Sequence, residues 1–501
     1  MYHAPAVNMS PAPEFRPDRA AWATISVTAE EEAVMCMRRE RDSLGEMDVP
    51  ASAYYGAQTA RAVRNFPLSG LKPHPAYVWA VVIIKKCAAR ANMSTGRLPA
   101  AIGDAIVAAA DEVLGGGLAD QFVVDPFQAG AGTSHNMNVN EVLANRALEL
   151  LGRQRGDFSS LHPNDHVNMA QSTNDVIPTA IRLASLELLE PLLEALTGLV
   201  NSLAAKGEEF DRILKSGRTH LQDAVPIRLG QEFCAYAAAV RRNGEGLEAC
   251  IPALQELGIG GNAVGSGLNA EPAYIRAMLE ELAIATGFQL KAAPDLFEAM
   301  QNMDPFLALS SALRRTAVTV GRIANDLRLL SSGPRTGLDE IRLPAVQPGS
   351  SIMPGKVNPS MAEMTNMVCY QVMGCDQAVM LAAQAGQLEL NVMMPLIAYN
   401  LLFSLELLKN CLGRFSDSCV SGIIANGERC RRYLEESLGL VTVLAPSIGY
   451  DAAAEVAKES MATGRSIREI VLSRALMTPA ELDQAMCPGH LTEPGLPLGR
   501  K

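Results

Sequence analysis

Four short segments of this 501-residue chain gather glycines, hydroxyls, amides and a few cationic side chains between long apolar stretches. In chain order they are Gly130–Asn138, His166–Asp175, Ser216–Asp223 and Gly349–Asn358, which we call segments 1 to 4. Hydroxyls and amides donate hydrogen bonds to carboxylate oxygens, and a lysine adds a full positive charge. Taken together, the segments indicate a site for a small dicarboxylate.

Taken singly, segments 1 to 3 also have structural explanations. A Ser-Thr-Asn-Asp string such as residues 172–175 commonly caps a helix. A lone histidine such as His220 is more often a structural hydrogen-bonder than a catalyst. Segment 4 is different, because core packing does not require two serines, a proline, a lysine and an asparagine within ten residues. It is typical of a flexible, donor-rich loop.

The sequence offers no metal or cofactor motif. Its ten cysteines form no CxxC pair and lie near no histidine at zinc spacing, and no nucleotide, zincin or serine-hydrolase motif appears. Chemistry by protein groups alone is then expected, such as removal of a proton beside a carboxylate. That step creates an enolate-like dianion, which a ring of fixed donors stabilises. A serine could be the base if backbone amides and a nearby cation stabilise its alkoxide in a closed, dry site.

Composition excludes other classes of protein. Lys plus Arg is 43 and Asp plus Glu is 54, so the net charge is −11, which argues against a nucleic-acid binder. The longest apolar run, Ala76–Ile84, stops at Lys85 and Lys86, well short of the ~20 residues that span a bilayer. Scattered cysteines are typical of free thiols in a reducing compartment, so we expect a cytoplasmic protein without membrane or nucleic-acid partners.

Helical periodicity predicts the elements that must position these segments. Helices are expected at Ala76–Asn92, Pro99–Leu114, Asn138–Leu151, Val176–Lys206, Pro226–Leu254, Phe297–Ser332, Ser360–Gly386, Pro395–Asn426, Gly464–Ala475 and Thr478–Met486. The long central helices are apolar around much of their circumference, which indicates burial against other subunits. The sequence therefore predicts a mainly α fold, a long helical bundle that oligomerises.

Segment 4 and the proline after it, Gly-Ser-Ser-Ile-Met-Pro-Gly-Lys-Val-Asn-Pro, match the signature of the aspartase/fumarase superfamily at every fixed position. Ala-Gly-Ala-Gly-Thr-Ser in segment 1 and Gly-Arg-Thr-His in segment 3 occur in the expected order and spacing. The chain thus resembles this superfamily from about Arg41 to Leu496. It is most similar to the aspartase branch, because Thr173 stands where fumarases usually have a second serine and residues 386–392 look more like aspartase.

The resemblance implies a reaction and a base. Aspartases convert L-aspartate to fumarate and ammonia by anti elimination through a stabilised carbanion. Ser350 aligns with the family's general base, which removes the C3 proton while the loop around it closes over the substrate. Lys356 and Asn358 align with residues that hold the carboxylate beside the leaving group.

The resemblance also implies roles for the other segments. The donors to the second carboxylate, where negative charge builds, would be Thr133, Ser172, Thr173 and Ser351. Asn174 and His220 align with groups near the amino group, and Thr219 is counted with the substrate-binding residues. His220 would pair with Glu363, as in the family's His–Glu couple.

The family fold has three mainly helical domains and assembles as a homotetramer with a twenty-helix core. Each active site draws on three subunits. For this chain the resemblance implies an N-terminal domain at 36–173, a central bundle at 174–428 and a small C-terminal domain at 429–501. Residues 1–35, which contain Pro, Ala and Glu and lack a signal-peptide pattern, are expected to form a flexible extension. No cofactor and no catalytic metal are implied, although divalent cations activate some aspartases.

The chain departs from the pattern at three places, the first being residues 1 to about 35, which have no counterpart in the family. Met394 stands where aspartases often have Glu, and Asn262 where Thr is common. None of these falls on an assigned site residue, so the departures concern subtype rather than reaction class. The alternative is a class II fumarase acting on malate and fumarate, which would share the base. A non-catalytic protein on the same fold is disfavoured, because Ser350 and Lys356 are both present.

Overall fold

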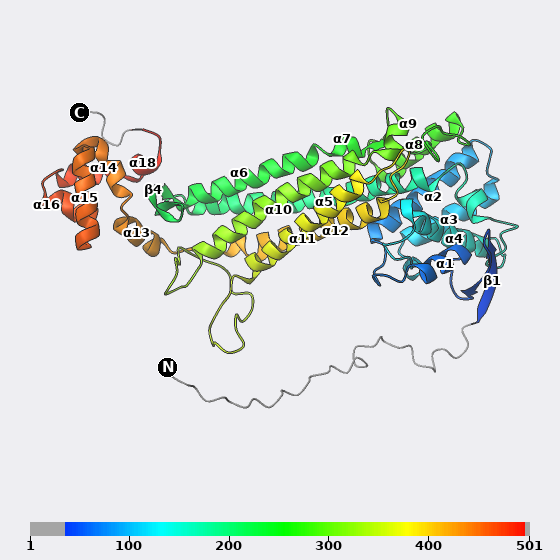
Figure 1. Cartoon of the computed structure of the whole chain (residues 1–501), viewed down its shortest axis with the longest axis horizontal. Helices are drawn as coiled ribbons and strands as arrows, with labels where there is room; N and C mark the ends of the chain where they lie inside the picture. Colours follow the sequence, from blue (N-terminus) through cyan, green and yellow to red (C-terminus); the bar gives the residue numbers. More distant parts are fainter. Residues whose placement is uncertain (1–35, 496–501) are drawn as a thin grey trace, which may run out of the picture.

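The computed structural model describes residues 36–495, so the flexible extension expected at 1–35 lies outside the described part. The molecule is elongated, with a long bundle of helices between two smaller ends (Figure 1). Most described residues are helical, which confirms the predicted mainly α fold class. The proposed domain boundaries stay a prediction. No helix in residues 36–495 is both long and apolar enough to cross a membrane.

Five long helices run side by side along the bundle (Figure 1). They are α5 (Thr173–Glu209), α6 (Leu229–Glu248), α10 (Asp304–Leu330), α11 (Ser360–Gln384) and α12 (Met394–Ser418). Leucines at 192, 196, 199 and 203 recur at three- and four-residue steps along α5 and are buried against its neighbours. With 37 residues at about 1.5 Å each, α5 is about 55 Å long.

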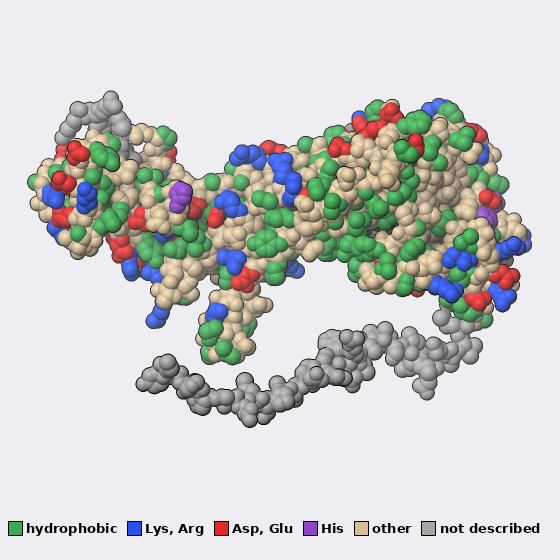
Figure 2. All heavy atoms as spheres, viewed as in Figure 1, with side chains coloured by type: hydrophobic (Ala, Val, Ile, Leu, Met, Phe, Trp, Pro, Cys, Tyr) green, Lys and Arg blue, Asp and Glu red, His purple; other side chains and the backbone are tan. Residues whose placement is uncertain are grey.

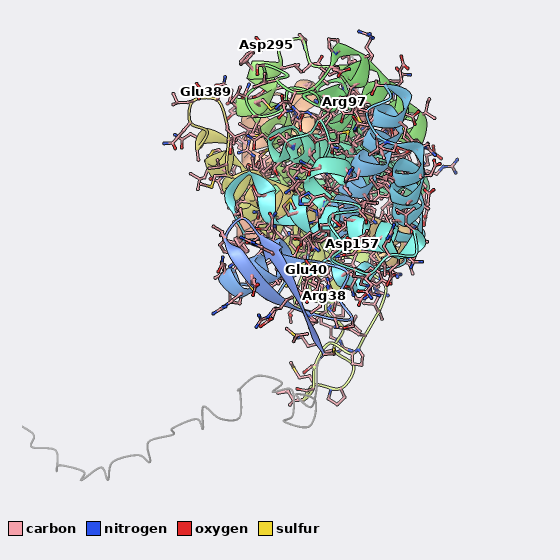
Figure 3. The ribbon with its side chains drawn as sticks, turned by 90° about the vertical axis from the view of Figure 1, so that its right-hand side faces the viewer. Arg38, Glu40, Arg97, Asp157, Asp295 and Glu389 are labelled. Atoms are coloured by element: carbon pink, nitrogen blue, oxygen red, sulfur yellow. The ribbon has the colours of Figure 1, made fainter. Side chains whose placement is uncertain are left out.

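The N-terminal end is a second helical layer packed on the start of the bundle. It contains α1 (Ala57–Asn65), α2 (Pro75–Ser94), α3 (Ala100–Leu114), α4 (Thr133–Leu150) and α8 (Pro272–Thr286). α2 contacts α3, α5 and α8, and its buried face runs without interruption into the core of the bundle. The antiparallel hairpin of β1 (Met37–Asp42) and β2 (Gly45–Pro50) covers this end. In the end-on view of Figure 3, Arg38 and Glu40 lie on that hairpin.

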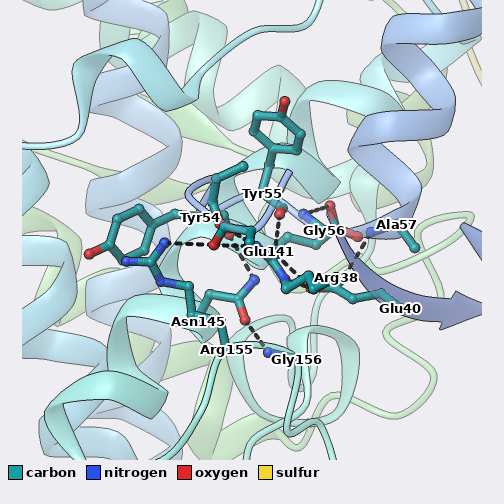
Figure 4. A network of polar contacts seen from close by, with 12 residues as sticks. Arg38, Glu40, Tyr54, Tyr55, Gly56, Ala57, Glu141, Asn145, Arg155 and Gly156 are labelled. Carbon is teal, nitrogen blue, oxygen red and sulfur yellow. Dashed lines mark hydrogen bonds and ion pairs between the residues drawn. The ribbon is translucent and has the colours of Figure 1, made fainter. Parts of the chain in front are cut away.

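A buried polar network ties the hairpin to α4 (Figure 4). The Glu141 carboxylate accepts hydrogen bonds from the backbone N–H groups of Gly56 (2.8 Å) and Thr59 (3.1 Å), at the start of α1. Burial raises the pKa of Glu141 to about 6, although these bonds oppose the shift. Arg38 donates to Glu40 and to the Tyr55 carbonyl at 2.7 Å. These contacts fix α4, whose first turn carries segment 1.

The remaining elements are short. The strands are β3 (Leu214–Thr219), β4 (Gln222–Arg228), β5 (Glu256–Leu257), β6 (Lys291–Ala292), β7 (Ile341–Arg342) and β8 (Ile424–Ala425). β3–β4 and β7–β8 pair antiparallel, and β5–β6 pair parallel. Short helices α7 (Ile251–Leu254) and α9 (Leu296–Gln301) lie between them. The C-terminal end has its own hydrophobic cluster within α13 (Gly427–Glu436), α14 (Leu440–Ile448), α15 (Tyr450–Thr463), α16 (Ile467–Ser473) and α17 (Pro479–Ala485), followed by α18 (Pro488–Thr492).

Several predicted helix bounds were wrong. α4 begins at Thr133, five residues earlier than expected, so Thr133 and Ser134 form its first turn rather than a preceding loop. Residues 226–228 belong to β4, because they pair with β3. The helix expected at 297–332 is two helices, since Asp304-Pro305 starts a new one after the break at 302–303. The helix expected to reach Asn426 ends at Ser418.

Candidate active site

Segments 1 and 2 meet where α4 and α5 begin. Ala131 and Gly132 have left-handed φ angles of 58° and 85°, which turn the chain sharply into α4. The Thr133 side chain is exposed at the first helical position. One turn further, the Asn136 side-chain amide donates to Thr173 Oγ1 at 3.0 Å. Thr133 and Thr173 are thus placed at adjoining helix N-termini.

The start of α5 is a fully formed capping box. Ser172 Oγ accepts from the backbone N–H of Asn174 at 3.2 Å, and the Asp175 carboxylate accepts from Ser172 N at 3.0 Å. Asp175 also accepts from the backbone of Gly260 and Asn262. Burial raises its pKa to about 6, against these hydrogen bonds. Ser172 is therefore held by the helix it caps, and the neighbouring loop is held by the same carboxylate.

Two adjoining helix N-termini form a ready anion site. The first N–H groups of each helix lack intrahelical partners, and the helix dipoles place partial positive charge at the same ends. Carboxylates bind well in such places. Thr133, Ser172, Thr173 and Asn174 add side-chain donors at this point, all of them exposed or half-buried. The arrangement can bind one carboxylate of a small acid without the help of a lysine.

Segment 3 is the turn of the β3–β4 hairpin. His220 and Leu221 form the two-residue turn between the paired residues Thr219 and Gln222. Both have left-handed φ angles, 55° and 59°, a conformation that costs non-glycine residues roughly 1 kcal/mol each. Thr219 and His220 are exposed, and Leu221 is 70% exposed at the tip. The hairpin presents these side chains outward, away from its own chain's core.

A buried ion cluster holds this hairpin in place. The Glu340 carboxylate, fully buried beside β7, accepts from Arg218 at 2.9 and 3.0 Å and pairs with Lys215 at 2.9 Å. Lys215 also pairs with Glu232 on α6 at 3.0 Å. Arg218 lies two residues before His220 in the same hairpin. Its charge is compensated by Glu340, so we assign it to the scaffold.

Segment 4 lies in a loop that protrudes from the bundle between β7 and α11 (Figure 1). Ser350 Oγ accepts hydrogen bonds from the backbone N–H groups of Ile352 (3.2 Å) and Met353 (3.0 Å). Two amides aimed at one hydroxyl oxygen stabilise negative charge there, as an alkoxide requires. Ser351 and Lys356 are exposed, and no residue of the described chain forms an ion pair with Lys356.

The base of this loop is closed by backbone contacts. Gly349 N donates to Lys356 O at 2.8 Å, and the Asn358 side chain donates to Gly349 O at 2.7 Å. A Cβ at Gly349 would come within 2.5 Å of Lys356 O, so only glycine allows this approach. Asn358 thus shapes the loop that carries Ser350.

One chain does not bring the four segments together. Segments 1 and 2 lie at the start of α5, whereas segment 3 follows its far end about 55 Å away. Segment 4 follows α10, and Glu340 links the root of its loop to the segment 3 hairpin. Within residues 36–495, His220 and Glu363 share no hydrogen bond or ion pair, so their coupling stays a prediction.

Two family models match the chain. One described as "Lyase" matches residues 45–374, and one described as "Fumarase C C-terminus" matches residues 440–493. The chain belongs to the aspartase/fumarase superfamily. The predicted resemblance is confirmed, including its likeness to the aspartase branch, which the curated relatives support.

Known proteins match this chain over most of its length. An aspartate ammonia-lyase of Bacillus subtilis (strain 168) is 50% identical over 92% of this chain and 97% of its own length. That of Escherichia coli (strain K12) is 47% identical over 91% and 96%. A solved fumarate lyase:delta crystallin from Brucella melitensis, bound to cobalt, has a TM-score of 0.89 at 52% identity, covering 92% and 100%. A class II fumarase from Schistosoma mansoni has a TM-score of 0.87 at 40% identity, covering 90% and 98%.

Sequence reasoning missed buried residues that hold the polar segments of the site in place. Lys85 on α2 is fully buried and donates to Asn168 at 2.7 Å and Gln171 at 3.0 Å, both in segment 2. Burial lowers its pKa to about 7. The sequence offered one signal for a buried Lys85, which is its position directly after the longest apolar run. Glu340 gave none, because its partners lie more than 100 residues away.

The ion cluster around Glu340 generates a prediction. Glu340→Gln leaves Lys215 and Arg218 facing a neutral amide in a buried place, which should destabilise the fold by about 3–5 kcal/mol. The segment 3 hairpin should loosen as well, so kcat/KM should fall. Thermal unfolding and steady-state kinetics measure the two effects. Glu232→Gln, at a partly exposed partner of Lys215, is the control and should change both much less. Equal effects of the two substitutions would contradict the assignment.

Proposed function

We propose that this chain is an aspartate ammonia-lyase, which interconverts L-aspartate with fumarate and ammonia. The observation that carries the proposal is the Ser350 hydroxyl, whose oxygen receives two backbone N–H donors in an exposed loop. Such a hydroxyl is prepared to lose its proton and act as a base. Curated relatives 47–50% identical to the chain are all aspartate ammonia-lyases, which supports the same reaction here.

The elimination balances without a cofactor. Ser350, as alkoxide, takes the C3 proton of L-aspartate, and the electron pair of the broken C–H bond moves into the adjoining carboxylate. The resulting dianion collapses to form the C2–C3 double bond, and the C2–N bond breaks to release ammonia. The Ile352 and Met353 amides stabilise the Ser350 alkoxide before it takes the proton. The positive charge of Lys356 in the same loop also stabilises this alkoxide.

The remaining site residues receive roles from their chemistry. The carboxylate where charge builds is bound at the two helix N-termini by Thr133, Ser172 and Thr173, with Ser351 from the closing loop. Lys356 and Asn358 serve the other carboxylate. Asn174, Thr219 and His220 lie near the amino group in this proposal, with His220 coupled to Glu363.

The proposed enzyme is a homotetramer with each site built from three subunits. The 55 Å separation along α5 supports this, because copies packed in opposite directions bring the two ends together. α11 supports it too, since one exposed face carries no charged residue: Met367, Tyr370, Gln371, Gly374, Gln377, Met380, Leu381 and Gln384. Apolar side chains gather along the bundle surface in Figure 2. An exposed helix face without charged side chains is typical of a surface that contacts another copy of the chain.

A class II fumarase is the second candidate. The match to the fumarase C-terminal model and the likeness to the Schistosoma mansoni fumarase favour it. It would use the same base and a different leaving group. Thr173, the first residue of α5, and the higher identity to aspartate ammonia-lyases favour ammonia as the leaving group.

The substrate separates the two candidates. Purified protein should produce fumarate, measured by its ultraviolet absorbance, from L-aspartate and not from L-malate. D-aspartate is the control, because the fixed donors recognise one arrangement around C2. Fumarate from L-malate alone would refute the aspartase proposal.

Ser350→Ala tests the base. The variant should lose activity by about a thousandfold or more, since it removes the proton acceptor while the loop's backbone contacts remain. Oligomeric state by light scattering should be unchanged. Ser360→Ala, at the start of α11, is the matched control and should retain activity. Near-normal turnover by Ser350→Ala would exclude this serine as the base.

A further inference from the structure

Lys85 is a buried cation for which the proposed mechanism has no use. Its side chain is 0% exposed, and no carboxylate of the described chain forms an ion pair with it, although the Asp175 charge raises its pKa against the larger effect of burial. A lysine is almost never fully buried unless it is paired. Its Nζ instead donates to two amide oxygens, Asn168 Oδ1 at 2.7 Å and Gln171 Oε1 at 3.0 Å. Both acceptors belong to segment 2, directly ahead of the start of α5.

The ammonium group dictates which way the amides around it point. In its ammonium form a lysine can only donate, so Asn168 turns its carbonyl oxygen toward Lys85. Its Nδ2 then donates to the Gln171 carbonyl at 3.2 Å. Asn136 meets the same Asn168 oxygen at 3.3 Å and must present its Nδ2, because two carbonyl oxygens would repel each other.

The orientation of the Asn136 amide decides whether the Thr173 hydroxyl accepts or donates a hydrogen bond within the protein. The second hydrogen of Asn136 Nδ2 is donated to Thr173 Oγ1 at 3.0 Å. The threonine oxygen therefore accepts from the protein, and its own hydrogen is left free to donate elsewhere. If Asn136 were reversed, the Thr173 hydroxyl would donate to its carbonyl oxygen and would be lost as a donor to a ligand.

The neighbouring amides show that this direction is imposed. Asn136 and Asn140 both turn Nδ2 toward Asn168 Oδ1, the latter at 3.3 Å. The buried carbonyl oxygens of both have no partner among the described residues. Leaving a buried acceptor unpartnered is unfavourable. The gain that offsets it is the shared contact with an oxygen polarised by Lys85.

We propose that Lys85 is a positioning residue that, through Asn168 and Asn136, fixes the Thr173 hydroxyl as a hydrogen-bond donor to the substrate carboxylate. The inference rests on the proposed function, in which Thr173 binds the carboxylate where charge builds. It adds a residue outside the polar segments, on α2, to the machinery of that site.

A double-mutant cycle tests this path. Thr173→Val removes the hydroxyl, and Lys85→Met removes the ammonium while keeping an apolar chain of similar length. Each should lower kcat/KM for L-aspartate by about tenfold or more, the loss expected for one hydrogen bond to a charged group. The double variant should be no worse than Thr173→Val alone within about twofold, because Lys85 acts through that hydroxyl.

The controls separate the possible failures. Lys86→Met removes the adjacent lysine, which pairs with Asp111 on the surface, and should leave kcat/KM unchanged. Multiplicative losses in the double variant would overturn the relay, since Lys85 would then act by general stability or by its field. Wild-type kinetics for Thr173→Val would instead refute the site assignment itself.

A second variant keeps the test decisive if Lys85→Met does not fold. Asn136→Asp has the same shape but offers an oxygen where the amide N–H₂ stood, which reverses the middle link. It should lower kcat/KM as Thr173→Val does, and it should have no further effect in the Thr173→Val background. An additive loss in that background would contradict the proposal.

Discussion

The length of α5 is the constraint on which the rest of the site depends. A continuous helix of 37 residues keeps its two ends about 55 Å apart, and the chain places donors for one carboxylate at one end and the strained His220 hairpin at the other. In the proposed enzyme, neither half acts alone. The exposed Leu221 tip, the protruding Ser350 loop and the uncharged face of α11 are all consistent with surfaces that another copy covers.

The position of the local positive charges explains how an acidic protein can bind an acidic substrate. The net charge of −11 is spread over the whole chain, whereas the groups that would meet the anion are few and local. Two helix N-termini supply partial positive charge, and Lys356 supplies a full one on the loop that closes over the substrate in the proposed mechanism. The charges of Arg218 and Lys215 are neutralised by Glu340 and Glu232. Lys85 does not reach the substrate and acts by orienting amides. Local geometry therefore outweighs the overall field.

Much of this could be read from the sequence. The polar segments, the long helices and the mainly α class follow from residue type and periodicity over many turns. The start of α4 could not, because Thr133 enters the helix directly after the Ala131–Gly132 turn, and the backbone N–H of Ala131 is held by the Val392 carbonyl, just before α12. The strand at residues 226–228 depends on its pairing with β3. Glu340, Asn136 and Lys85 gain their roles from partners distant in the chain, and local patterns do not report those.

Complementation between inactive variants tests the central claim, that a complete site exists only between copies. Ser350→Ala and Asn174→Ala alter opposite halves and should each be inactive alone. When the two are unfolded together and refolded as a mixture, activity should return above the sum of the separately refolded variants, because some hybrid sites take an intact residue from each chain. A mixture that mass measurement shows to be hybrid, yet is no more active than that sum, would contradict the account.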